Sequence, residues 1–203
     1  MRHGVDGDRI DLETRHNRRV HAISSGEVAE QKRPARAEPV NRHTLSVTVD
    51  NEPGVLARIA GLFSGRGYNI ESLTVSETEH EKHISRITIV TTGTNAVIEQ
   101  IKSQLHRLVP VHRVVDLTLQ GQAIERELVL VKVVGKGENR LEAMRLASAF
   151  GARTLDATLT SFVFELTGAT EEVERFINTM TVVGLVEVSR TGVAAMSRGT
   201  AGM

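Results

Sequence analysis

The stretch from Asn51 to Leu73 constrains the fold of this chain more than any other segment. A turn rich in proline and glycine (52–54) opens it, and apolar residues then recur at helical spacing until a glycine-flanked stop at 65–67. Strand patterns precede the turn at 45–49 and follow the stop at 68–77. A helix between two short strands predicts an α+β unit. The apolar positions behind this prediction are Leu45, Val47, Val49, Val55, Ile59, Leu62 and Phe63.

The residues that follow complete a β-α-β-β-α-β order. A turn at 78–82 leads to a strand at 84–91, and Thr94 is suited to cap a second helix. A last strand is predicted at 111–119. This order is that of a ferredoxin-like domain. The apolar face of the second helix consists of Val97, Ile101 and Leu105.

The same order recurs in the second half of the chain, after a short linker at 121–123. Strands are predicted at 128–134, 154–158, 161–166 and 185–189. Two helices lie between them, one over 138–150 and one capped by Thr170, with acidic residues in its first turn where the helix dipole favours them. Their apolar faces are Leu141, Met144 and Ala147 in the first, and Val173, Phe176, Ile177 and Met180 in the second. We therefore predict an α+β fold of two tandem ferredoxin-like domains, at residues 43–120 and 121–203.

Residues 1–42 differ from the rest. They are rich in charged residues, and their apolar residues are isolated and without period. Such a segment cannot bury enough surface to order itself, so we predict a disordered extension, or a start site placed too far upstream.

Composition excludes several classes of protein. Lys plus Arg and Asp plus Glu are both 25, and a protein that binds a polyanion normally has a basic excess. The chain has no cysteine, which excludes disulfides and thiolate chemistry and fits a reducing compartment. No apolar run approaches the roughly 20 residues that span a bilayer. We expect a soluble cytoplasmic protein that binds neither nucleic acid nor membranes.

The start of the first helix is a candidate site for a small zwitterion. The N–H groups of a helix's first turn lack intrahelical acceptors and suit a carboxylate, and the amides of Asn51 and Asn69 can hold an ammonium group. By sequence alone, Asn51 fits an Asx-turn equally well, Gly54 fits a helix-entry glycine, and Asn69 fits the start of a strand.

Other candidate sites are weaker. Four of the eight histidines (His80, His83, His106 and His112) lie at turns or element ends without metal-ligand spacing, which favours solvated surface positions over a metal site. Gly135-Lys136-Gly137 lacks the rest of a phosphate-binding loop, which favours a simple connection. No triad, carboxylate pair or cofactor fingerprint emerges, so we expect no catalytic residue.

The segment DNEPGVLARIAGLFSGRGYNIESLTV resembles the start of an ACT domain, the amino-acid-sensing module, and more narrowly the small regulatory subunit of acetolactate synthase (acetohydroxyacid synthase). The similarity continues through SRITIV, RELVLVKV and FELTG and ends at VEVSRTGVAAMSRG, so it covers about residues 42–199. Arg190, Gly192 and the pair Arg198-Gly199 match the family's C-terminal RTG and SRG, where we expect a docking or structural role.

The resemblance implies that effector valine binds between the ACT domains of a homodimer. Gly54, which has no side chain, would let the carboxylate approach the helix, and Asn51 would accept a hydrogen bond from the ammonium group. Pro53 replaces a serine that is frequent in the family and fits helix entry. Glu138 would repel a carboxylate at the first helix of the second domain, so no second valine site is expected there. The implied valine-binding residues are Asn51, Gly54, Val55 and Leu56 of one chain and Asn69 and Ile70 of the other.

The resemblance also implies a regulatory subunit without cofactors of its own. Its partner would be the large catalytic subunit of acetolactate synthase, which uses thiamine diphosphate, FAD and Mg²⁺ to condense two pyruvates, or pyruvate and 2-oxobutyrate, in branched-chain amino-acid biosynthesis. The small chain would raise activity and confer allosteric feedback inhibition by valine. One methylene is worth only about 1–3 kcal/mol, so valine, leucine and isoleucine should differ in degree.

The sequence argues against one other function and leaves two open. An RNA-binding module needs aromatic side chains on its central strands, and the strands at 45–49 and 84–91 have none. Another ACT-type amino-acid sensor and a small acylphosphatase-like enzyme stay open.

Overall fold

The computed structural model describes residues 38–79, 81, 83–119 and 123–200. The predicted extension at 1–42 lies almost wholly outside them, as do His80, two residues of the predicted linker and the last three residues. The boundary predicted at residue 42 falls inside the first strand, because β1 (Asn41–Asp50) already includes Arg42. No helix in the described part of the chain is long and apolar enough to cross a membrane.

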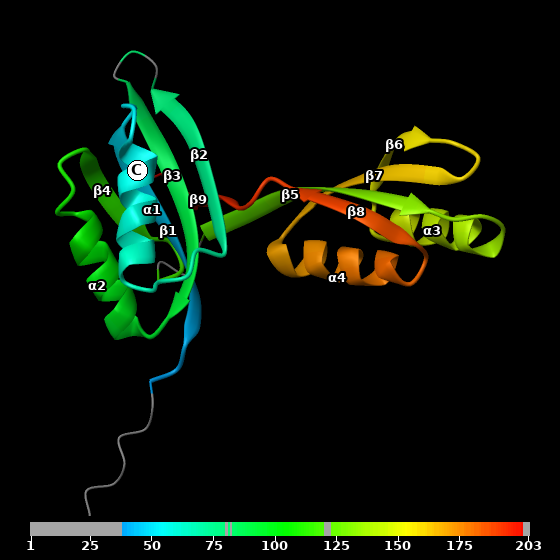
Figure 1. Cartoon of the computed structure of the whole chain (residues 1–203), viewed down its shortest axis with the longest axis horizontal. Helices are drawn as coiled ribbons and strands as arrows, with labels where there is room; N and C mark the ends of the chain where they lie inside the picture. The colour runs from blue at the N-terminus through cyan, green and yellow to red at the C-terminus, as the bar shows by residue number, and fades with distance from the viewer. Residues whose placement is uncertain (1–37, 80, 82, 120–122, 201–203) are drawn as a thin grey trace, which may run out of the picture. The chain divides into compact units, whose positions relative to one another are not determined.

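The first sheet has the strand order β2-β3-β1-β4, all antiparallel to their neighbours, as a β-α-β-β-α-β unit requires (Figure 1). Helices α1 and α2 cover one of its faces. The elements are β1, α1 (Val55–Gly65), β2 (Ser72–Glu79), β3 (Ile84–Gly93), α2 (Asn95–Leu105) and β4 (Val111–Asp116).

The predicted alternation along β1 points its apolar side chains at these helices. Leu45, Val47 and Val49 are at most 1% exposed and pack with Ile59 and Phe63 of α1 in one aliphatic core. The cap predicted at Thr94 is confirmed, because its hydroxyl accepts the Val97 N–H at 3.4 Å. β2 is shorter than predicted at its start, since 68–71 precede the strand, and β4 ends at Asp116 rather than 119.

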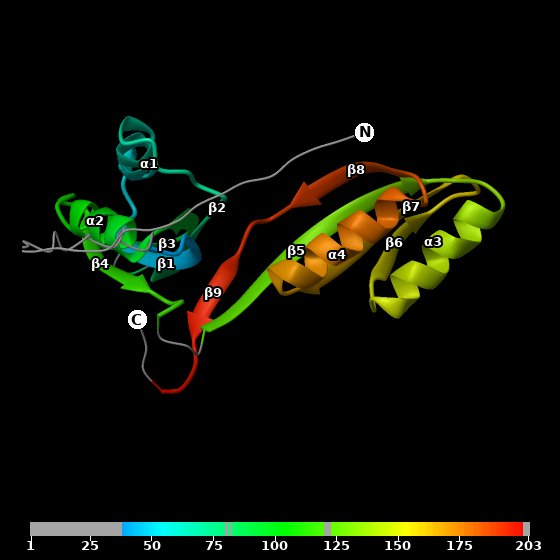
Figure 2. The same cartoon turned by 90° about the horizontal axis from the view of Figure 1, so that it is seen from below.

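The second sheet has the order β6-β7-β5-β8, and a further strand, β9, pairs with the start of β5. Helices α3 and α4 lie side by side on one face (Figures 1 and 2). The elements are β5 (Ala123–Val134), α3 (Glu138–Ala149), β6 (Arg153–Ala157), β7 (Ser161–Gly168), α4 (Thr170–Thr181), β8 (Leu185–Arg190) and β9 (Ala194–Ser197).

Three predictions for this unit were wrong. Of the predicted face of α3, Ala147 is buried as expected, but Leu141 and Met144 are 57% and 45% exposed. Ala143 is buried in their place, because small side chains let α3 approach the sheet closely. Thr170 is the first residue of α4 rather than its cap. β9 was not predicted, and β5 starts at Ala123, before the predicted strand and inside the predicted linker. The predicted face of α4 was right: Val173, Phe176 and Met180 are fully buried, and Ile177 packs against their core.

Candidate functional site

The N-terminus of α1 presents free backbone donors at an open surface. Gly54 occupies the N-cap position in the left-handed conformation (φ 89°), and its carbonyl accepts the Arg58 N–H at 3.0 Å. The N–H groups of Leu56 and Ala57 have no backbone acceptor among the described residues. A Cβ built on Gly54 would meet no atom within 4 Å. The helix end is therefore open to a small anionic group.

The two asparagines lie at opposite ends of the first sheet. Val90 of β3 pairs with Thr44 of β1 and Ser72 of β2, whereas Ile84 pairs with Asp50 and Glu79. The residue after Asp50 is Asn51, and Asn69 stands just before Ser72. From Ile84 to Val90 the strand rises about 20 Å, since each residue adds about 3.3 Å. Within one chain, the prediction that both asparagines flank the same helix N-terminus is therefore wrong.

The side chains of both asparagines are open to solvent. Asn51 and Asn69 are exposed, and no hydrogen bond joins either side chain to another residue in the described ranges. Their main chains are fixed, because the Asn51 N–H donates to the His83 carbonyl at 2.6 Å and the Thr91 hydroxyl donates to the Asn69 carbonyl at 2.6 Å. The asparagine amides are thus held in place with their hydrogen-bonding capacity unused.

The apolar residues of the predicted valine site differ in their exposure to solvent. Leu56 is 43% exposed, while Val55 is 3% exposed and belongs to the core. Ile70 is partly buried against the same core. Leu56 and Ile70 can therefore line an apolar pocket, whereas Val55 contributes mainly its backbone at the helix start.

The C-terminal residues that matched RTG contact strand β2. The Val193 N–H donates to the Ser72 hydroxyl at 2.9 Å, and the Thr74 hydroxyl donates to the Thr191 carbonyl at 3.5 Å. Gly192 lies between them in the left-handed region (φ 79°). A Cβ on Gly192 would lie 2.6 Å from the Ser72 hydroxyl, so this close approach requires glycine.

Two arginines, Arg190 and Arg42, form ion pairs beside the contact between residues 191–193 and β2. Arg190 donates from Nε and Nη2 to the two carboxylate oxygens of Glu127, both at 2.8 Å, and also pairs with Glu174. Its pKa is raised, first by the hydrogen bond to Glu127. Arg42 pairs with Glu71 at 3.8 Å and Glu125 at 2.9 Å. Arg42, Glu71, Glu127, Glu174 and Arg190 border a pocket of about 380 Å³. The two bonds to Glu127 give Arg190 a structural role.

The histidines form no metal site among the described residues. His83, His106 and His112 are exposed, as predicted, although His112 contacts Asp50 at 2.6 Å. Sequence reasoning missed His43, which is 2% exposed and contacts the buried carboxylate of Asp116 at 2.8 Å. The alternation in β1 carried the signal, since His43 lies on the same face as Leu45.

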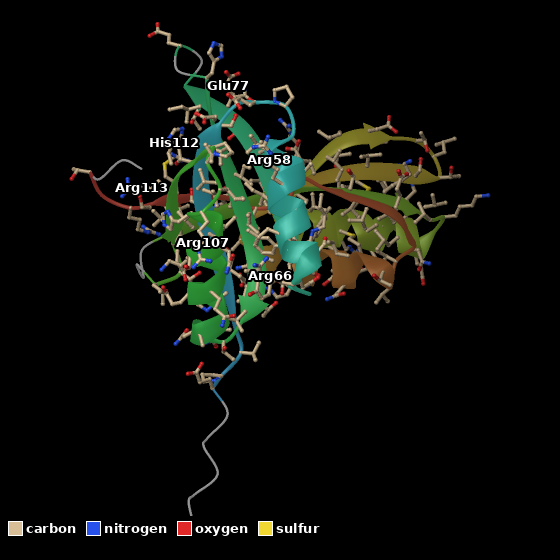
Figure 3. All side chains as sticks on the ribbon, turned by 60° about the vertical axis from the view of Figure 1, so that its left-hand side comes forward. Arg58, Arg66, Glu77, Arg107, His112 and Arg113 are labelled. Carbon is tan, nitrogen blue, oxygen red and sulfur yellow. The ribbon has the colours of Figure 1, made fainter. Side chains whose placement is uncertain are left out.

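The edge strand β4 and its neighbouring loop carry basic side chains. Arg107, His112 and Arg113 are exposed on this side of the first sheet (Figure 3). On the opposite edge, β2 exposes Val75 by 45%. The edge at β4 is therefore basic, whereas β2 exposes the apolar Val75 and the acidic Glu77.

Comparisons with known proteins match both halves of the chain to one family. Residues 45–113 match the model of an AHAS small subunit-like ACT domain, and residues 126–199 match the model of the small subunit of acetolactate synthase. The first range lies within the first sheet unit (41–116), and the second covers most of the second sheet unit (123–197).

Two named relatives are similar in sequence to this chain along most of their own length. The probable acetolactate synthase small subunit of Archaeoglobus fulgidus is 46% identical over 78% of this chain and 98% of its own. The acetolactate synthase isozyme 3 small subunit of Salmonella typhimurium is 45% identical over 78% of this chain and 96% of its own.

A solved structure extends the similarity to the fold. The acetolactate synthase small subunit of Thermotoga maritima is 37% identical, with a TM-score of 0.71 over 79% of this chain and 99% of that chain. The chain therefore belongs to the family of acetolactate synthase small subunits and carries that family's ACT domain.

Proposed function

We propose that this chain is a non-catalytic regulatory subunit that binds L-valine, activates an acetolactate synthase catalytic subunit and makes it sensitive to feedback inhibition. The observation that carries the proposal is the open N-terminus of α1 in a chain of this family. Its free N–H groups at Leu56 and Ala57 suit the α-carboxylate of an amino acid, which Gly54 leaves room for.

The ligand site is shared between two copies of the chain. The first copy supplies Asn51, Gly54 and the start of α1, and the second supplies Asn69 and Ile70. This division is supported by the sheet register, which separates Asn51 from Asn69 by about 20 Å within one chain. Valine is much shorter than that, so only two chains can bring both amides to one ligand. Leu56 and Ile70 then contact its branched side chain.

The second copy pairs along β2 rather than β4. Like charges oppose edge-to-edge pairing, and β4 carries exposed Arg113 and His112 beside Arg107 (Figure 3). β2 is the last strand at the other end of the strand order among the described residues, and its exposed Val75 supplies an apolar contact. Pairing along β2 also brings Asn69, close before this strand, to the interface that the proposal requires.

The partner is the large catalytic subunit, which would hold thiamine diphosphate, FAD and Mg²⁺. We assign effector binding and dimerisation to residues 43–120 and the completion of inhibitory coupling to residues 121–203. Glu138 supports this division, because it places a carboxylate in the first turn of α3, where a second valine carboxylate would otherwise bind.

Thermal unfolding with added amino acids tests the ligand. A ligand that binds only the folded state stabilises it, by about 2.7 kcal/mol when its concentration is 100 times its Kd. L-valine should raise the melting temperature with dose, whereas D-valine and glutamate should not. No shift at millimolar L-valine would contradict the proposal, and a response only to an unrelated amino acid would make the chain a different ACT-type sensor.

Gly54→Asp tests the site. The position is exposed and its Cβ has open space, so the variant should fold with only the left-handed strain of its backbone (φ 89°), while its carboxylate occupies the anion position. Gly151→Asp is the matched control, because Gly151 is also exposed and left-handed (φ 69°) with no atom near its Cβ. Gly54→Asp should activate the catalytic subunit but abolish valine inhibition, and Gly151→Asp should retain both. Normal inhibition in Gly54→Asp would refute the site.

A further inference from the structure

We propose that residues 191–197, here called the strap, transmit valine binding from β2 to the C-terminal unit. The inference rests on the proposed function and adds to it the physical route of regulation. The strap follows directly on β8, an edge of the second sheet, contacts the first sheet, and ends with β9.

The strap is attached to β2 by contacts that tolerate little change. Ser72 accepts the Val193 N–H at 2.9 Å, and Val193 is only 2% exposed, so this donor has no access to solvent as an alternative. Gly192 brings the main chain so close that a Cβ would lie 2.6 Å from the Ser72 hydroxyl and 2.9 Å from that of Thr74.

Apolar packing holds the strap on the same sheet. Val193 and Ala195 form a separate buried cluster with Val90 of β3 and with Leu117, which follows β4. Leu117 in turn donates its N–H to the Thr44 carbonyl at 2.9 Å. The sheet face opposite α1 and α2 is therefore partly covered by the strap. Thr44, which pairs with Val90 on this face, is fully buried.

The two ends of the strap belong to the second unit. Arg190, directly before it, is fixed by the bidentate bond to Glu127 on β5 and by Glu174 on α4. At its other end, β9 pairs with residues 123–126 of β5. A displacement of the strap must therefore act on β5, the central strand of the second sheet.

The attachment point lies next to the proposed effector residues. Ser72 is two residues after Ile70, a distance of about 7 Å along an extended chain. The intervening Glu71 donates its N–H to the Val90 carbonyl at 2.8 Å, and its carboxylate reaches Arg42, which also pairs with Glu125 of β5. Two short connections thus lead from residues 69–70 to β5, one through the strap and one through Glu71 and Arg42. The strap makes the closer contact with β2, at 2.9 Å, compared with 3.8 Å between Glu71 and Arg42.

An effector changes activity only through a structural element whose conformational equilibrium is coupled both to the effector site and to the regulated surface. The strap meets this condition, because it contacts β2 on one side and continues β8 on the other. Weakening its attachment should leave valine binding in place and reduce the effect of bound valine.

The test compares two strap variants with matched controls in the full-length chain. Ser72→Ala removes the acceptor of the Val193 N–H, and Ser76→Ala changes an exposed serine on the same face of the same strand. Gly192→Ala adds the clashing Cβ, and Gly151→Ala imposes comparable left-handed strain (φ 69°) with no atom within 4 Å. For each chain, valine affinity is measured by calorimetry, and activation and valine inhibition are measured after reconstitution with the catalytic subunit.

Both strap variants should bind valine within about threefold of the unmodified chain and should still activate. The loss of one buried hydrogen bond should weaken the coupling between valine and activity by about three- to tenfold, seen as residual activity at saturating valine. The controls should be inhibited normally.

Full inhibition of both strap variants would overturn the inference and leave the proposed function intact. Absence of valine binding by the unmodified chain would instead overturn the proposed function, and the inference with it. If Gly192→Ala fails to fold, Ser72→Ala decides alone, since it only removes one oxygen atom.

Discussion

Replacing Arg190 with alanine should destabilise the second unit far more than removing an ordinary surface arginine. Two nitrogen atoms of Arg190 donate to the two carboxylate oxygens of Glu127, which is only 4% exposed. Without Arg190, a carboxylate is left in the interior of the sheet without its cation. Arginine stays protonated at all working pH values, so the effect should not depend on the protonation of Arg190.

The magnitude follows from the burial of the pair. Removing one partner of a fully buried pair costs about 3–5 kcal/mol, and Arg190 is 33% exposed, so we expect roughly 2 kcal/mol. Both sheets belong to one compact unit of about 160 residues, and at that size each kcal/mol lowers the melting temperature by about 2–4 °C. Arg190→Ala should therefore lower it by about 4–8 °C in thermal unfolding followed by circular dichroism.

Arg153→Ala is the matched control. Arg153 also lies on an edge strand of the second sheet and pairs with Glu165 at 2.9 Å, but its side chain is 70% exposed. Exposed pairs contribute at most about 1 kcal/mol, so this variant should shift the melting temperature by about 4 °C at most. The double variant Arg190→Ala/Glu127→Ala should be more stable than Arg190→Ala alone. Equal shifts for the two single arginine variants would refute the reasoning.

Two further predictions concern the backbone and the N-terminus. Gly184→Ala should lower the free energy of unfolding in urea by at least about 3 kcal/mol, because its Cβ would lie 2.2 Å from the Val134 carbonyl oxygen. Gly151→Ala, whose Cβ has open space, should lower it by only about 1–2 kcal/mol through left-handed strain, and equal losses would contradict this prediction. A truncated protein that starts at Glu38 keeps all of β1 and should unfold within about 0.5 kcal/mol of the full chain, and a larger loss would give the preceding residues a structural role.

The order of elements was predictable because it depends on local periodicity. The alternation at Leu45, Val47 and Val49 and the cap at Thr94 both depend on nearest neighbours, and both were confirmed. The face of α3 was not predictable in this way. Leu141 and Met144 share helical spacing with Ala147, but so does Ala143, and the close approach of helix and sheet selects the alanines.

The candidate site likewise has features that local sequence predicts and features that depend on the tertiary structure. The open N-terminus of α1 follows from the local sequence around Gly54, and the structure contains it. The separation of Asn51 from Asn69 depends on the parallel course of β1 and β2 on either side of β3, which local patterns do not encode. The contact of Gly192 with Ser72 joins residues far apart in sequence, so the RTG motif showed that these residues matter without showing what they touch.

The central claim is that this chain couples valine to the activity of a separate catalytic subunit. The most direct measurement is the acetolactate synthase activity of that subunit, alone and with increasing amounts of this chain, with and without L-valine. We predict that the chain raises activity to a plateau at a fixed ratio and that L-valine lowers activity only when the chain is present. Activity that does not change when the chain is added, or valine inhibition that is equal without it, would contradict the account.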